Sequence, residues 1–287
     1  MNEAADQFMV KFWGTRGSMP TPGHETLRYG GNTSCVEVRC NSEIIIFDAG
    51  TGIAKLGQKL QKEEPIQASL FFSHVHWDHI QGMPFFLPAY HPGNKLKLYG
   101  NKNWSTKLEY ALRWQMQSPT FPVTFDEMNK TGAKMEYIDI QRGEVFRIGA
   151  DKSIIVRSGE LNHPDKAFGF RVEYNGKTLV YATDVENLPH VKKDFLELAA
   201  GADFLIHDAQ YTHIEYFGLN GSSPRRNWGH STPEAAAEAA KLAGVKNLIL
   251  FHHEPTHNDD KIDEMLKTAM EIFPDTVAAY EGMEINL

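Results

Sequence analysis

Five short apolar runs in this chain are each followed directly or closely by histidine or aspartate. They are residues 43–47 before Asp48, 70–72 before the polar cluster 74–79, 178–183 before Asp184, 203–206 before His207 and Asp208, and 247–251 before His252 and His253. Runs of this length and composition predict buried β-strands. In open α/β sheets the ligand crevice lies outside the carboxyl ends of the strands, so we expect these polar side chains to converge on one rim.

Helical patterns alternate with the apolar runs. The clearest covers residues 233–243, where Ser231 or Thr232 can serve as N-cap, Pro233 stands in the first turn and Gly244 ends the helix. His230 therefore lies just before a predicted helix N-terminus, a position suited to meeting an anion, although a surface histidine in a capping loop would look the same.

A second helix is predicted over residues 104–117 from the spacing of its apolar side chains. These are Trp104, Leu108, Ala111, Leu112 and Met116. The region 104–125 could form a lid, a dimer surface, or an ordinary packed helix and loop. Residues 134–181 are rich in strand patterns, and no linker or repeat interrupts the chain. The pattern predicts an α/β fold in one domain over residues 1–287.

Composition adds limits on partners and compartment. The formal charge is −8 with a pI near 5.9, so no broad basic surface is available for holding nucleic acid nonspecifically. Cys35 and Cys40 are five positions apart in a predicted strand, so they face opposite sides and we expect free thiols in a reducing compartment. With no signal-peptide pattern and no membrane-length apolar run, we expect a cytoplasmic protein without a membrane partner.

The strongest chemical signal is the segment His74-Val75-His76-Trp77-Asp78-His79. It follows the apolar run 70–72, with one serine between them. Imidazole nitrogen and carboxylate oxygen are ligands for zinc, manganese and iron near neutral pH. Four such groups so close together repel one another when charged, and a metal ion is the commonest partner that makes them compatible. The segment therefore predicts a metal site.

Taken in order, these motifs resemble those of the metallo-β-lactamase superfamily of hydrolases. The shared elements are FDAG at Asp48, HVHWDH at 74–79, LNHP at His163, YATD at Asp184 and LILFHH at His252. Three further segments are similar to the phosphodiesterase branch, which includes tRNA 3′-processing endonucleases and cyclic-phosphate phosphodiesterases. They are WGTRGSMPTP at 13–22 with GNTS at 31–34, DHIQGMP at 78–84, and WGHST at 228–232.

The resemblance implies a four-layer αβ/βα sandwich, with two mixed sheets flanked by helices. It also implies two divalent metal ions. His74, His76 and His163 would hold one ion, Asp78, His79 and His252 the other, and Asp184 both. The motif favours His252 over its neighbour His253 without deciding between them. Asp48 would accept hydrogen bonds that orient the histidine loop. Zinc is the expected metal, and manganese or iron(II) suit the same ligands.

The resemblance implies hydrolysis by a hydroxide shared between the two metal ions. Two such ions, about 3.5–4 Å apart, lower the pKa of the water that they share towards about 7. His230 and Asp78 are the predicted catalytic residues. His230 would act as general acid towards the leaving alkoxide, as the matching histidine does in the resembled branch.

The substrate expected is a small or cyclic phosphodiester, because the acidic chain shows no long glycine-rich, basic insertion of the kind that grips tRNA. A structured RNA is the second choice. Arg225 and Arg226 could bind a substrate phosphate or lie in a solvated turn. An ester, thioester or lactone hydrolase is a further alternative, as is a non-catalytic metal-bound sensor. A homo-oligomer through 104–125 also stays open.

Overall fold

The computed structural model describes residues 7–101, 105–221 and 223–287, which form two mixed sheets of seven strands each. The first sheet runs in the order β14 (Glu284–Asn286), β1 (Phe8–Gly14), β2 (Cys35–Cys40), β3 (Glu43–Phe47), β4 (Gln67–Phe71), β5 (Lys95–Asn101) and β6 (Lys134–Ile140). The second runs in the order β13 (Thr276–Ala278), β12 (Asn247–Phe251), β11 (Phe204–Asp208), β10 (Lys177–Ala182), β9 (Phe168–Tyr174), β8 (Ile154–Glu160) and β7 (Val145–Ile148).

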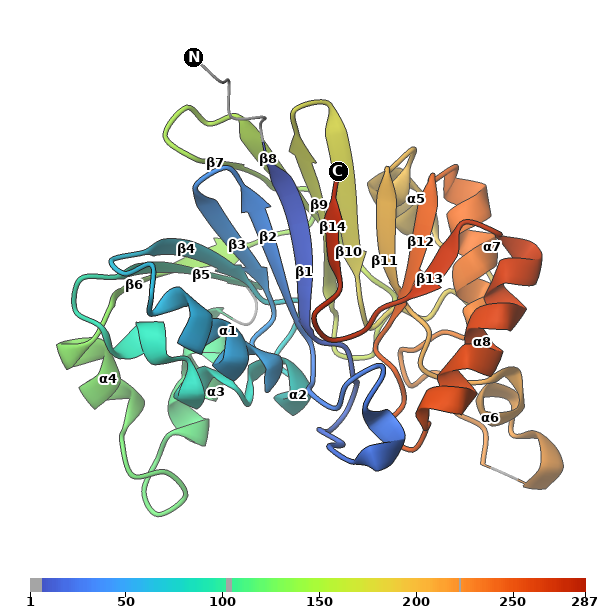
Figure 1. Cartoon of the computed structure of the whole chain (residues 1–287), viewed down its shortest axis with the longest axis horizontal. Coiled ribbons are helices and arrows are strands. Elements are labelled where there is room, and N and C mark those ends of the chain that lie inside the picture. Colours follow the sequence, from blue (N-terminus) through green and yellow to red (C-terminus); the bar gives the residue numbers. More distant parts are fainter. Residues whose placement is uncertain (1–6, 102–104, 222) are drawn as a thin grey trace.

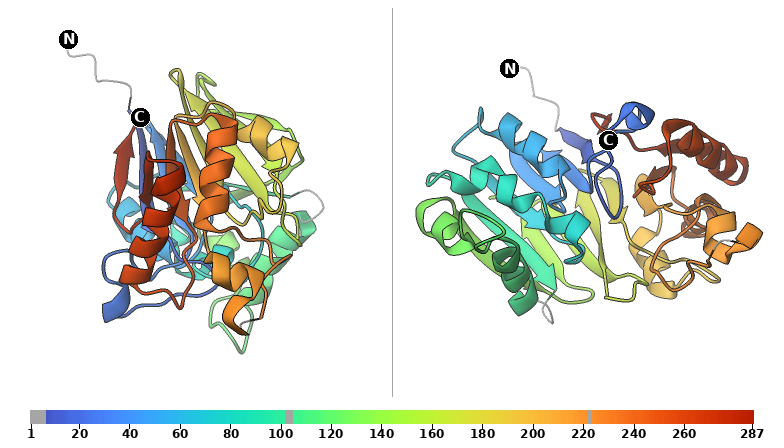
Figure 2. Two further views of the ribbon diagram at one scale, coloured as in Figure 1. Left: turned by 90° about the vertical axis from the view of Figure 1, so that its right-hand side faces the viewer. Right: turned by 90° about the horizontal axis from the view of Figure 1, so that it is seen from below.

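Helices cover the outer face of each sheet (Figure 1). On the first sheet they are α1 (Gly52–Leu60), α2 (Trp77–Ile80), α3 (Ser105–Gln115) and α4 (Phe125–Thr131). On the second they are α5 (Lys193–Ala199), α7 (Pro233–Ala243) and α8 (Asp259–Ile272), with α6 (His213–Phe217) below them. Short 3-10 turns lie at His24–Thr26, Met83–Phe85, Leu87–Tyr90 and Leu219–Gly221. The views in Figure 2 show the same layering, helix–sheet–sheet–helix, so the predicted four-layer sandwich is confirmed.

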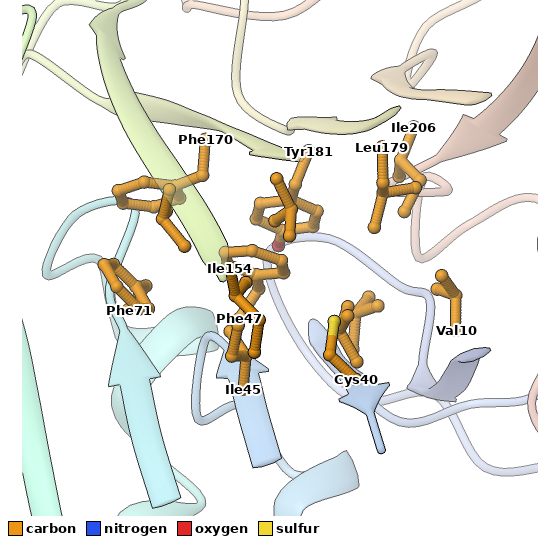
Figure 3. Packing of buried hydrophobic residues seen from close by; sticks show 14 of the residues in the cluster. Val10, Cys40, Ile45, Phe47, Phe71, Ile154, Phe170, Leu179, Tyr181 and Ile206 are labelled. Carbon is orange, nitrogen blue, oxygen red and sulfur yellow. The ribbon is translucent and has the colours of Figure 1, made fainter. Parts of the chain in front are cut away.

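Central strands such as β3 and β12 are apolar on both faces because the middle of each sheet is buried on both sides. In β3, Ile45 and Phe47 point into the core between the sheets, while Ile44 and Ile46 point into the core under α1. Figure 3 shows Phe47 from the first sheet facing Tyr181 from the second, and their rings stack with centroids 5.0 Å apart. This two-sided burial explains why the sequence showed continuous apolar runs.

The two cysteines of β2 follow the expected alternation. Cys35 lies in the core under the helices, Cys40 lies between the sheets, and both are free thiols. The prediction that they do not pair is confirmed.

Element boundaries mostly agree with the sequence patterns to within a few residues. The helix over 233–243 has the predicted limits, with Thr232 as N-cap and Gly244 left-handed at its end. The apolar run that ends at His207 and Asp208 forms β11, and the strand includes both residues. They belong to the strand because β11 lies between two parallel strands and its last residues pair with β10 and β12.

Candidate metal centre

The polar residues that follow the strands meet at one edge of the sandwich, the lower edge in Figure 1. The histidine segment follows β4 and leads into α2, Asp184 follows β10, and His252 follows β12. His163 comes from the loop between β8 and β9. Parallel strands in each sheet carry these residues to the same edge, so segments far apart in the sequence supply one site.

The first group of potential ligands consists of three histidines and one aspartate. Suitable atoms of His74, His76, His163 and Asp184 all lie within 4.8 Å of one another. Nε2 of His74 and Nε2 of His163 are buried and have no hydrogen-bond partner in the described structure. A buried, unpaired nitrogen costs free energy unless something binds it. Both atoms face the shared centre of the group.

The second group consists of Asp78, His79 and His252. Nε2 of His252 lies 3.3 Å from Nε2 of His79 and 3.1 Å from Oδ2 of Asp78. Asp184 connects the groups, because its Oδ2 lies 3.2 Å from Nε2 of His79 and its Oδ1 lies 3.6 Å from Nε2 of His74.

The side chains of the adjacent residues His252 and His253 point to different surroundings. His252 reaches the second group, whereas Nε2 of His253 lies 2.9 Å from the carbonyl oxygen of Ala279. The ring of His253 packs edge-on against Tyr29, away from the other potential ligands. Only His252 of this pair is placed to hold an ion with Asp78 and His79.

Each histidine of the two groups uses one ring nitrogen for a contact with the protein and leaves the other available. The contacts are His74 Nδ1 to Ser73 Oγ (3.1 Å), His76 Nε2 to Asp165 Oδ2 (2.9 Å), His163 Nδ1 to the Asp165 amide (3.3 Å), His79 Nδ1 to Asp48 Oδ2 (2.8 Å) and His252 Nδ1 to Gln210 Oε1 (3.2 Å). Such contacts fix the orientation of metal-binding imidazoles.

Asp48 contacts the histidine segment from the end of β3. Its carboxylate accepts hydrogen bonds from the amide and hydroxyl of Ser73, from Tyr181 and from Nδ1 of His79. The side chain is fully buried between the sheets. Four donors to one carboxylate fix both the segment and the ring of His79.

The electrostatics of the site differ between its histidines. Burial lowers the pKa of His163 to about 4, and burial also holds the pKa of His74 well below its usual value. Burial alone would lower the pKa of His79, but the carboxylates of Asp78 and Asp184 outweigh it and hold that pKa well above its usual value. Burial alone would raise the pKa of Asp184, but His252 and His79 outweigh it and hold that pKa well below its usual value. A histidine ligates metal in its neutral form, so a bound cation would take the place of the proton on His79. The residues present fit divalent metal ions.

The backbone is strained where these side chains are presented. Asp48, Asp184 and His252 have positive φ angles of 59°, 52° and 62°. Residues other than glycine rarely adopt this region, and such strain clusters at functional sites. Gly17 allows the approach of His252, because a Cβ at Gly17 would lie 2.4 Å from the His252 ring.

His230 lies beside the metal-binding groups rather than in a surface loop. Its ring is nearly parallel to that of His252, with centroids 5.1 Å apart, and its Nδ1 lies 2.7 Å from Oδ2 of Asp208. Burial alone would lower the pKa of His230, but the Asp208 carboxylate outweighs it and raises the pKa to about 9. His230 also groups with Asp184 and His252 as a potential ligand.

Several supporting residues were not assigned by sequence reasoning. Asp208 was noted only as a strand end, although it binds His230 and the Ser231 amide. Gln210 links His252 with Ser18 and Glu254, and the Ser18 amide donates to Asp78. Asp208 was visible as part of the strand-end pattern, but the others had no local signal.

Arg225 and Arg226 lie near the site in different surroundings. The guanidinium of Arg225 lies 4.7 Å from the ring centroid of Tyr211, and the Tyr211 ring packs edge-on against His230. Arg225 also faces Glu254 at 3.8 Å. Arg226 lies over Phe217 instead. Tyr211 thus lies between Arg225 and His230, and a phosphate-binding role for either arginine stays a prediction.

The region 104–125 forms α3 and the loop after it, whereas Trp104 lies outside the described residues. Leu108, Leu112 and Met116 are buried in the core under the first sheet. Tyr110 and Trp114 are exposed on the other side of the helix. One face of α3 is therefore an ordinary packed helix face, and the other presents aromatic side chains to the exterior.

A family model described as the beta-lactamase superfamily domain matches residues 43–253, more than half of the chain. The chain belongs to the metallo-β-lactamase superfamily. It is thus a metallo-β-lactamase-fold enzyme of the metal-dependent hydrolase class, as predicted. In the part of the chain that the structure describes, no helix has both the length and the apolar character required to span a bilayer.

Curated relatives and solved structures agree with this assignment. The chain is 25% identical to ribonuclease Z of Picrophilus torridus, over 99% of this chain and 97% of that protein. The crystal structure of human tRNase Z, short form, superposes with a TM-score of 0.62 and 23% identity. The match covers 96% of this chain and 98% of the human chain. A diphosphatase from the PhnP family matches 98% of this chain and 97% of its own with a TM-score of 0.69 and 16% identity.

Proposed function

We propose that this superfamily member is a phosphodiesterase with two divalent ions that hydrolyses a small or cyclic phosphodiester. The observation that carries the proposal is the position of Asp184 between two ligand groups, with His230 and its partner Asp208 beside them. His74, His76 and His163 would hold one ion and Asp78, His79 and His252 the other, with Asp184 in contact with both. When bound, such ions activate a water molecule and neutralise charge on a phosphoryl group.

His230 supplies the proton that an alkoxide leaving group needs. Its Nδ1 faces Asp208, so the proton available to the substrate is on Nε2. Asp208 accepts hydrogen bonds from the Ser231 amide as well as from His230, and this fixes the ring. A positioned acid matters most for poor leaving groups such as the alkoxide of a natural phosphodiester.

Two observations support a small substrate. The alignment with the Picrophilus ribonuclease Z extends over 319 positions although this chain has 287 residues, so that relative carries segments without a counterpart here. The chain is also acidic, with a net charge of −8, which disfavours binding many phosphates at once. Arg225, held over Tyr211, would bind one non-reacting phosphate oxygen or carboxylate at the site.

A tRNA-processing endoribonuclease is the second candidate. The observation in its favour is that curated relatives with the name ribonuclease Z match nearly the full length of the chain. The same ligand groups and the same acid would serve both reactions, so the candidates differ in substrate size rather than in chemistry.

The test is hydrolysis of bis(p-nitrophenyl) phosphate by metal-stripped protein reconstituted separately with zinc, manganese and iron(II). We expect turnover that requires metal and is abolished in Asp184→Ala. A panel of nucleoside cyclic phosphates and a precursor tRNA then separates the two candidates. Protein that holds two ions but hydrolyses no phosphodiester would refute the proposal in favour of an ester, thioester or lactone hydrolase. Stoichiometric ligand binding without turnover of any kind would indicate a sensor.

A further inference from the structure

An uncharged groove begins at the histidine segment of the site. It has a volume of about 860 Å³ and lies between that segment, α2, the turn after it and the C-terminal half of α3 with its loop. Its lining includes Val75 and Trp77, which alternate with the ligands of the histidine segment, and Trp114 and Phe121 from α3 and the loop after it. The groove therefore borders the segment that carries His74, His76 and Asp78, while the ligands themselves are not part of its lining.

The groove is lined by aromatic rings that are open to the exterior. Trp77, Trp114 and Phe85 are 70%, 66% and 58% exposed. Large aromatic side chains gathered in one exposed patch indicate a binding surface. None of the described residues that line the groove is charged, although charged residues make up 23% of the chain.

Neighbouring contacts hold the groove in shape. The side-chain amide of Gln115 in α3 donates to the carbonyl oxygen of Ile80 in α2, at 3.0 Å. Phe85 and Phe121 pack edge to face with centroids 5.6 Å apart. The opposite face of α3 is buried in the core. The aromatic walls are thus fixed to the same segment that carries the metal ligands.

We infer that this groove binds the planar, uncharged base of a nucleoside phosphodiester while its phosphate lies at the metal centre. The inference rests on the proposed function and names its substrate class. Base stacking on aromatic side chains requires open ring faces, and the groove provides them. A polynucleotide backbone would need cations along the groove, and the described lining has none. The volume suits one small molecule.

The test compares two substrates with the same reacting group, adenosine 2′,3′-cyclic phosphate and methyl riboside 2,3-cyclic phosphate, which lacks the base. In metal-loaded Trp114→Ala we expect KM for the first substrate to rise about tenfold, kcat to stay similar, and the second substrate to be unaffected. Tyr280→Ala is the control, because Tyr280 is a half-exposed aromatic residue outside the groove.

An equal rise in KM for both substrates would overturn the inference. A change from dimer to monomer in Trp114→Ala would overturn it too, because the groove would then bind a second copy of the chain. A loss confined to precursor tRNA would assign it to a polynucleotide. Equilibrium dialysis of the metal-loaded protein with adenosine separates this inference from the proposed function, because adenosine has no phosphodiester. Binding about tenfold weaker in Trp114→Ala than in wild type supports the groove even without turnover, and equal binding refutes it.

Discussion

At the scale of single residues, the two ring nitrogens of each histidine in the ligand groups have different surroundings. One nitrogen contacts the protein and the other faces the centre of a ligand group. Because the contacting partners Asp48 and Gln210 are buried, the rings cannot turn away to other partners. This preorganisation keeps the imidazoles close together in a buried site, where the ring nitrogens that face one another could share a cation.

Replacement of His230 by alanine tests the acid at the same scale. We expect His230→Ala to slow hydrolysis of adenosine 2′,3′-cyclic phosphate by about 10²–10⁴-fold, because the alkoxide then leaves without a proton. Hydrolysis of bis(p-nitrophenyl) phosphate should change far less, since nitrophenolate is a good leaving group. Steady-state rates on both substrates, with metal content measured in parallel, provide the comparison.

The exposed His190 provides the matched control, and His190→Ala should behave as wild type. Equal slowing of both substrates with metal retained would mean that His230 is not the acid. A loss of bound metal in His230→Ala would instead identify it as a ligand, which its grouping with Asp184 and His252 makes a concrete alternative.

At the scale of elements, the start of α7 fixes the position of His230. Thr232 caps the helix through the Ala235 amide, and the two residues before it, Ser231 and His230, both bind Asp208 at the end of β11. The helix is thus tied to the strand on which the site is built. Its poly-alanine face packs closely on the second sheet, which leaves the start of the helix little room to move.

Removal of this cap should cost stability. We expect Thr232→Ala to lower the free energy of unfolding by about 1 kcal/mol, because the Ala235 amide loses its partner at the helix start. Thr268→Ala, in the middle of α8, is the control and should cost nothing or stabilise slightly, since alanine is the better helix former. Urea unfolding curves of both variants, with equal slopes, measure the difference, and equal stabilities would contradict a capping role.

At the scale of the whole molecule, both halves of the sandwich are needed for each ligand group. The first sheet supplies His74, His79 and Asp78, and the second supplies His163, Asp184 and His252. A bound ion therefore links the two sheets across their shared edge. Folding and metal binding should be coupled, because the unfolded chain holds no such arrangement of ligands.

Metal removal tests this coupling. We compare metal-stripped protein with protein in zinc at a concentration about 100 times the dissociation constant of the zinc complex. Binding then contributes about 2.7 kcal/mol to the free energy of unfolding. We therefore expect the stripped protein to melt at a temperature about 5–10 °C lower. Asp184→Ala should show a smaller shift, because it lacks the carboxylate between the two groups. Thermal unfolding followed by circular dichroism measures both, and an unchanged melting temperature in wild type would show that the residues do not bind zinc.

Much of the fold was readable from the chain. Two-sided burial made the central strands appear as continuous apolar runs, and local capping residues defined the helix over 233–243. The superfamily assignment rested on motifs that are short and local, and it is confirmed. At the end of β11, sheet pairing rather than an apolar residue type holds His207 and Asp208 in the strand.

The sequence by itself determined which residue types stand at the ends of the strands, because a strand followed by a polar group is a local pattern. Only the tertiary structure decided that His252 rather than His253 reaches the site, that Asp208 holds His230, and that Trp77 and Trp114 line one groove. Each of these depends on contacts between segments far apart in the chain. Sheet order and packing fix such contacts, and no single segment encodes them.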